Sequence, residues 1–150
     1  GKAHSGSPFR QALEHPDGRC RSYSLAGFQP HSVSVEHLEI VGASGRAVPR
    51  SALKGPASVD EVYAALDGPT FVSFDLDAVD QSVAPGVSAP ATGGMSTELW
   101  LRAAWAAGAN PLVTSADVVE LCPPLDRDGQ TARLAAVTLW HLLRGLCERA

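Results

Sequence analysis

The pattern of apolar and polar positions predicts strands and helices that alternate along the chain. Three segments rich in β-favouring side chains are expected to be strands: 21–28, 70–76 and 112–121. Helices are expected over 32–41 and 131–148, where apolar residues recur at helical spacing. A helix is also expected over 96–107, where Ser96 is followed by the acidic Glu98 in the first turn. A fourth helix is expected from the capping-box sequence Ser58–Glu61 to about Leu66. This alternation is typical of an α/β fold with a mainly parallel sheet.

Two segments are expected to lack regular structure. The first is the loop 42–49, which follows the predicted helix 32–41. The second is the longer segment 78–94, in which Pro85, Pro90 and several glycines interrupt any periodic pattern. Loops of that length are usually functional, and this one directly follows a predicted strand.

Composition narrows the class of protein. The chain has 150 residues, of which 45% are hydrophobic, as expected for one globular domain. Its net charge of -4 comes with no basic stripe, which argues against nucleic acid and anionic membranes as partners. No apolar stretch reaches the roughly 20 residues of a membrane helix, and no export segment is seen, so a cytoplasmic protein is expected. The three widely spaced cysteines indicate reduced thiols.

The end of the predicted strand 70–76 carries the first candidate chemistry. Alternate residues of a strand share a face, so Asp75 and Asp77 are expected to point the same way, with their Cα atoms about 6.6 Å apart. Ligands bind at this end of the strands in open α/β sheets. Paired carboxylates favour Mg²⁺, Ca²⁺ or Mn²⁺, and added imidazoles would favour Mn²⁺ or a later transition ion. Alternatively, both acids cap the next turn or face solvent.

The residues around this pair carry a family resemblance. The stretch 73–86, SFDLDAVDQSVAPG, followed by Gly94, resembles the metal-binding signature of the ureohydrolases, the family of arginase, agmatinase and formimidoylglutamase. Blocks at 6–10, 117–123 and 131–136 resemble the same family in the same order, and the loop 84–90 is most similar to formimidoylglutamases. The resemblance implies a three-layer α/β/α, arginase-like fold. It also implies that residues 1–150 are the C-terminal portion of the domain, with the N-terminal part missing.

The resemblance further implies a binuclear manganese site with Asp75 and Asp77 among its ligands. In such a site a metal-bound hydroxide attacks a planar, amidine-like carbon. Glu120 would accept hydrogen bonds from the cationic nitrogen of the substrate, although its local sequence alone favours a strand-end salt bridge. Arg10 would attract the glutamate end of the substrate, or is a solvated surface residue. Ser5 stands where the family has a histidine, so the adjacent His4 is either the proton shuttle or a surface or loop residue.

The family's Gly-Gly-x-His and Asp-Ala-His-x-Asp ligand blocks do not occur in this sequence. The ligand set is therefore incomplete, and we expect a homo-oligomer or a missing N-terminal segment to cover the exposed apolar surface. The expected reaction is hydrolysis of N-formimidoyl-L-glutamate to L-glutamate and formamide, a step of histidine degradation. The alternatives are an agmatinase-like guanidino hydrolase and a non-catalytic, truncated remnant or assembly subunit.

Overall fold

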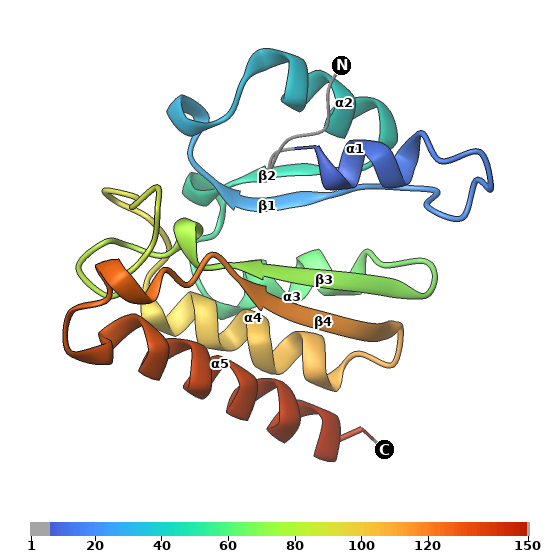
Figure 1. Cartoon of the computed structure of the whole chain (residues 1–150). Helices are drawn as coiled ribbons and strands as arrows, with labels where there is room; N and C mark the ends of the chain where they lie inside the picture. Colours follow the sequence, from blue (N-terminus) through green and yellow to red (C-terminus); the bar gives the residue numbers. More distant parts are fainter. Residues whose placement is uncertain (1–6, 150) are drawn as a thin grey trace. The chain divides into compact units, whose positions relative to one another are not determined.

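The computed structural model describes residues 7–149, and the chain divides into two compact units, 1–50 and 51–150 (Figure 1). Within the first unit, β1 and β2 pair in parallel and Val41 of α2 is fully buried. Phe9 and Tyr23 stack their rings with centroids 4.9 Å apart. The elements of this unit are α1 (Pro8–Leu13), β1 (Leu25–Phe28), η1 (Pro30–Ser32), α2 (Val35–Ser44) and β2 (Ala47–Pro49), with η2 (Arg50–Ala52) at the unit boundary.

The prediction that residues 42–49 form a loop is wrong. Helix α2 continues to Ser44, and Ala47–Pro49 forms the short strand β2. These three residues form a strand because they pair with β1. Their own sequence, which is short and ends in proline, does not predict a strand. A side chain at Gly45 would collide with the Tyr23 backbone, so the turn between α2 and β2 requires glycine.

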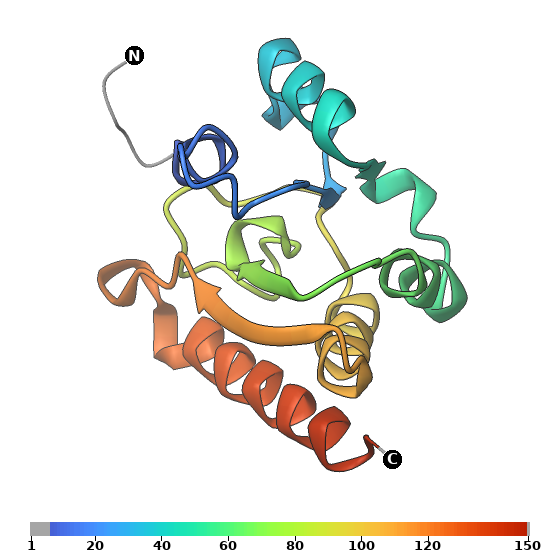
Figure 2. The ribbon, with the colours of Figure 1, turned by 90° about the vertical axis from the view of Figure 1, so that its right-hand side faces the viewer.

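The second unit is built on the parallel pair β3 and β4, in which Ser73 lies opposite Asp117 and Asp75 opposite Val119. Helices α4 and α5 lie side by side on one face of this pair (Figures 1 and 2). The elements of this unit are α3 (Pro56–Ala64), β3 (Thr70–Asp75), η3 (Leu76–Ala78), α4 (Thr97–Ala109), β4 (Val113–Val119), η4 (Pro123–Leu125), η5 (Arg127–Gly129) and α5 (Gln130–Cys147).

Close helix packing and aromatic contacts form the core of the second unit. Added Cβ atoms at Gly108 and Gly145 would collide with backbone atoms of the facing helix, so these glycines let α4 and α5 approach closely. Trp100 packs edge-on against Phe74 of β3, with centroids 5.4 Å apart. Its indole N–H donates to the buried Thr138 hydroxyl at 2.7 Å. This contact ties α4 to α5 beneath the sheet.

The strands expected in the second unit and the two long helices are confirmed, and both strand pairs are parallel. The predicted start of the earlier helix is wrong. Helix α3 begins at Pro56, which fits the first turn because its missing N–H is not needed there. Ser58 lies inside the helix, and its hydroxyl accepts from the Gly55 N–H at 3.2 Å. Among residues 7–149, no helix is long and apolar enough to cross a membrane.

Candidate metal centre

Carboxylates gather at the ends of β3 and β4. Asp75 is the last residue of β3, Asp117 lies within β4, and Glu120 directly follows β4. The two strands are parallel, so their carboxyl ends lie at the same edge of the pair. The aspartates of the signature stretch and the glutamate of the later block therefore meet, although more than forty positions separate them in the sequence.

Asp75 and Asp77 do not lie on one strand, contrary to the sequence expectation. Strand β3 ends at Asp75, and Leu76–Ala78 forms a 3₁₀ turn. The Asp75 carboxylate accepts the backbone N–H of Asp77 at 2.9 Å, which caps this turn. Leu76 is fully buried and fixes the turn to the core. The two side chains are thus brought together by a turn rather than by strand alternation.

The electrostatics of these carboxylates are unfavourable when all are charged. Burial, with further contributions from the charges of Asp75 and Glu120, raises the pKa of Asp77 to about 6, although a hydrogen bond from the Ala89 backbone opposes the rise. Asp75 is still reached by solvent, but protein atoms replace part of the water around its carboxylate and thereby raise its pKa. The negative charges of Glu120 and Asp117 raise this pKa further. Like charges that cannot separate favour protonation or a bound cation.

Two buried oxygens of this cluster fit a cation. Among the residues that the structure describes, Oδ1 of Asp77 and Oδ1 of Asp117 are buried and have no hydrogen-bond partner. Unpaired buried carboxylate oxygens are costly, and coordination to a hard cation removes that cost. In the same part of the chain, however, no group of three or more His, Cys, Asp or Glu side chains is arranged to hold a metal ion. The described residues therefore supply part of a ligand set.

Asp117 is the member of this cluster that the sequence alone does not mark as a site residue. It belongs to the block at 117–123, but nothing in its local sequence separates it from an ordinary strand residue. Its partner in the register, Ser73, lies two positions before Asp75. Only the parallel pairing of β3 with β4 shows that Asp117 lies close enough to Asp75 for its negative charge to raise the Asp75 pKa.

The long segment 78–94 is irregular, as expected, and a single carboxylate organises much of it. Asp80 accepts hydrogen bonds from the Ser82 backbone at 3.0 Å, the Ser82 hydroxyl at 2.5 Å and the Gly93 backbone at 2.8 Å. These donors lower the pKa of Asp80. The backbone also closes on itself, because Met95 N–H donates to Ala78 at 2.8 Å. The loop beside the carboxylates is therefore fixed by hydrogen bonds.

The remaining candidates lie in the first unit or outside the described residues. Arg10, on α1, is exposed and pairs with Glu14 at 2.8 Å and Glu36 at 3.2 Å. These partners already engage its charge, so its substrate role stays a prediction. His4 lies outside the described residues.

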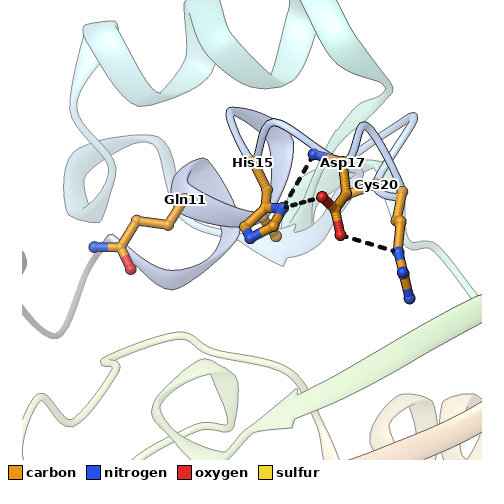
Figure 3. A pocket seen from close by; sticks show the side chains of 6 residues that line it. Gln11, His15, Asp17 and Cys20 are labelled. Carbon is orange, nitrogen blue, oxygen red and sulfur yellow. Dashed lines mark hydrogen bonds and ion pairs between the residues drawn. The ribbon is translucent and has the colours of Figure 1, made fainter.

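A surface hollow beside α1 contains other polar side chains but none of the cluster carboxylates. Figure 3 shows His15 and Asp17 turned toward each other, with His15 Nδ1 accepting from the Asp17 backbone at 3.2 Å. Both side chains are exposed. The hollow belongs to the first unit, and it is lined by Gln11, Ala12, His15, Asp17, Arg19 and Cys20.

Comparison with known proteins decides the family. A model of the arginase family matches residues 1–144. The chain belongs to the arginase family. Within this family it is similar to the formimidoylglutamase of Halalkalibacterium halodurans, with 34% identity over an alignment of 161 positions, gaps included. The alignment covers 97% of this chain and 48% of that protein. It is also similar to the guanidinopropionase of Pseudomonas aeruginosa, with 42% identity over 83 residues, or 55% of this chain and 26% of that protein.

Solved structures of arginase-family proteins share the fold. The formiminoglutamase of Trypanosoma cruzi, solved with Mn²⁺, superposes with a TM-score of 0.90 and 30% identity. The match covers 100% of this chain and 52% of that one. The arginase-like α/β fold expected from the sequence is thereby confirmed. The chain spans about half the length of the relatives that it matches.

Proposed function

We propose that this chain is part of a manganese-dependent arginase-family enzyme that hydrolyses N-formimidoyl-L-glutamate to L-glutamate and formamide. The observation that carries the proposal is the carboxylate cluster at the ends of β3 and β4. Two of its buried oxygens are unpaired among the described residues. The similarity to formimidoylglutamases over most of the chain favours this substrate, which would place the enzyme in histidine degradation.

In this proposal Asp75 and Asp77 hold Mn²⁺ through their carboxylates. Bound Mn²⁺ would supply a water of lowered pKa and would offset the negative charge that develops during the addition. Water adds to the amidine carbon and the bond from that carbon to the glutamate nitrogen breaks. The leaving nitrogen takes up a proton, so that L-glutamate and formamide are released.

The side chains of this chain would bind and orient the substrate. Glu120 is exposed at the end of β4, and its charge reaches both Asp75 and Asp77. We infer that it accepts hydrogen bonds from the cationic nitrogen of the amidinium, a charge-assisted contact of high strength. The loop 84–90, which contributes the Ala89 backbone N–H to Asp77, would form one wall of the substrate pocket.

The proposal requires metal ligands from outside residues 7–149. Within that range, no third side chain joins Asp75 and Asp77 in a geometry that could hold a metal ion. We infer that a further segment or a second copy of the chain supplies them.

Hydrolysis of a guanidino acid is the second candidate. It is favoured by similarity to the guanidinopropionase of Pseudomonas aeruginosa and to the human mitochondrial guanidino acid hydrolase, which is 30% identical over 151 residues. The products distinguish the two reactions, because guanidino hydrolysis releases urea and formimidoyl hydrolysis releases formamide.

The test combines metal binding with product analysis. Mn²⁺ binding is measured by titration calorimetry on the chain alone and on the chain mixed with the N-terminal half of a related formimidoylglutamase. Formamide and urea are then quantified with both substrates. We expect Asp77→Asn to lose Mn²⁺ affinity, whereas the matched control Asp67→Asn, an exposed carboxylate between α3 and β3, retains it. Wild-type protein that neither binds Mn²⁺ nor forms formamide in the mixture would contradict the proposal and favour a non-catalytic remnant.

A further inference from the structure

The backbone of Gly86 joins three segments that lie far apart in the sequence. Its N–H donates to the Thr131 hydroxyl at 2.7 Å, in a buried hydrogen bond. Its carbonyl accepts the backbone N–H of Cys122 at 2.8 Å. We call these two hydrogen bonds the Gly86 junction. It connects the loop 78–94, the turn after β4 and the first turn of α5.

The α5 side of the Gly86 junction is itself rigidly held. Thr131 is fully buried. Asp126 accepts the backbone N–H groups of Thr131 at 2.8 Å and Ala132 at 2.9 Å, which caps the start of α5. Gln130 donates to the carbonyls of Ser82 at 2.7 Å and Val83 at 3.0 Å. The Thr131 hydroxyl is thus a fixed point against which the loop is placed.

The other side of the Gly86 junction leads to Glu120. The backbone φ of this residue is 68°, in the left-handed region that residues other than glycine rarely adopt. Such a conformation persists only where the surrounding structure imposes it, and it occurs often at functional sites. Cys122, two residues further on, is held by the Gly86 carbonyl. The Gly86 junction therefore fixes the chain directly after the strained residue.

We propose that Thr131 is a positioning residue: through Gly86 and Cys122, its hydroxyl holds Glu120 in the backbone conformation that presents the carboxylate to the cationic nitrogen of the substrate. The inference rests on the proposed role of Glu120 in substrate binding. Thr131 itself is fully buried, so its side chain would not contact the substrate. Its effect is on substrate affinity rather than on the chemistry.

The first test measures the Gly86 junction directly. Thr131→Val removes the hydroxyl at nearly constant volume, and Thr131→Ser retains it. Thr138→Val is the matched control, because Thr138 is also a fully buried threonine of α5, but its hydroxyl bonds Trp100 and Leu134 instead of the loop. Amide hydrogen exchange of Gly86 and Cys122 is followed by NMR. We expect Thr131→Val to speed exchange of the Gly86 amide by about tenfold, the effect of one lost hydrogen bond, and exchange of the Cys122 amide by a smaller factor, because its acceptor, the Gly86 carbonyl, remains.

The variants separate positioning from general destabilisation. Thr131→Ser should exchange like the wild type, and Thr138→Val should leave the ratio of Gly86 exchange to that of the β3 amides unchanged. Equal acceleration in Thr131→Val and Thr138→Val, or unchanged Gly86 exchange in Thr131→Val, would overturn the proposal. If Thr131→Val fails to fold, Thr131→Ala takes its place with Thr131→Ser as control: faster Gly86 exchange in Thr131→Ala alone supports the hydroxyl's role, and equal exchange in the two variants contradicts it.

The second test is kinetic and uses formimidoylglutamate with the Mn²⁺-loaded, fully assembled protein. We expect Thr131→Val to raise KM about tenfold while kcat changes less, and Thr131→Ser to restore KM. A fall in kcat with constant KM would refute a positioning role for Thr131. Absence of activity in the wild type would overturn the proposed function, and the role of Glu120 with it, whereas the exchange measurements decide the Gly86 junction separately.

Discussion

Asp77→Asn is expected to stabilise the metal-free chain at neutral pH. Burial and neighbouring charges raise the pKa of Asp77 from 3.8 to about 6. The rise corresponds to at most about 3 kcal/mol of unfavourable free energy for the charged form, at about 1.4 kcal/mol per pH unit. Because the side chain is only partly buried and solvent screens its neighbours, we expect about 1–2 kcal/mol of this to be recovered in the variant.

The pH dependence follows from the sign of that shift. The folded state binds the Asp77 proton more tightly than the unfolded state, so the penalty is absent below about pH 4, grows between about pH 4 and 6, and is complete above. Asparagine does not ionise. The stability difference between Asp77→Asn and wild type should therefore be present at pH 7.5 and small at pH 4.

Urea denaturation in the presence of a chelator measures this difference, with Asp67→Asn as the control for loss of an exposed carboxylate. Equal stabilities of wild type and Asp77→Asn at pH 7.5, or the same difference at pH 4 and 7.5, would refute the reasoning. When the segment that supplies the remaining ligands is added, saturating Mn²⁺ should reverse the order, because a ligand at 100 times its Kd stabilises the wild type by about 2.7 kcal/mol and Asp77→Asn loses much of that gain.

Two further predictions concern the loop and the turn beside the cluster. Gly86→Ala should lower the free energy of unfolding by about 1–3 kcal/mol, because its Cβ would lie 2.5 Å from the Asp126 side chain. Gly42→Ala, in α2 with nothing within 4 Å of the added atom, should instead raise it by about 0.5–1 kcal/mol in the same urea titration. Glu120→Gly should relieve the positive φ and raise stability by up to about 1 kcal/mol, while formimidoylglutamate binding by calorimetry becomes weaker. A Glu120→Gly variant that is less stable than wild type would show that the left-handed conformation is not strained.

Elements with a strong local pattern were predictable from the sequence. Helix α4 begins where Ser96 accepts the Leu99 N–H, with Glu98 in its first turn, as these two residues predicted. Strand β3 has the expected apolar side chains and ends one residue early. The strand β2 was not predictable, because its three residues become a strand only through pairing with β1. The start of α3 was misplaced because Pro56 allows the helix to begin before the capping-box sequence.

The candidate site was predictable only in part, for a similar reason. Asp75 and Asp77 stand out locally, since both acids follow a buried strand. The expected geometry was wrong, because the side chain of Asp75 itself caps the turn that contains Asp77. The proximity of Asp117 and the Gly86 junction depend on contacts between distant segments, which no local pattern contains.

The loop is held by many hydrogen bonds and the carboxylates are not, so the carboxylates are the part of the site whose free energy a bound cation would change most. The loop 78–94 has its polar backbone engaged by Asp80, Thr131 and Gln130, so moving it would break several hydrogen bonds at once. The carboxylates of Asp77 and Asp117 are buried with an oxygen unpaired among the described residues, and the pKa of Asp77 is raised. A cation bound by these oxygens would lower the free energy of the carboxylates, while the hydrogen bonds of Asp80, Thr131 and Gln130 keep the loop in place. The pocket wall would then be preorganised before the metal arrives, and metal binding would act mainly on the charge of the site.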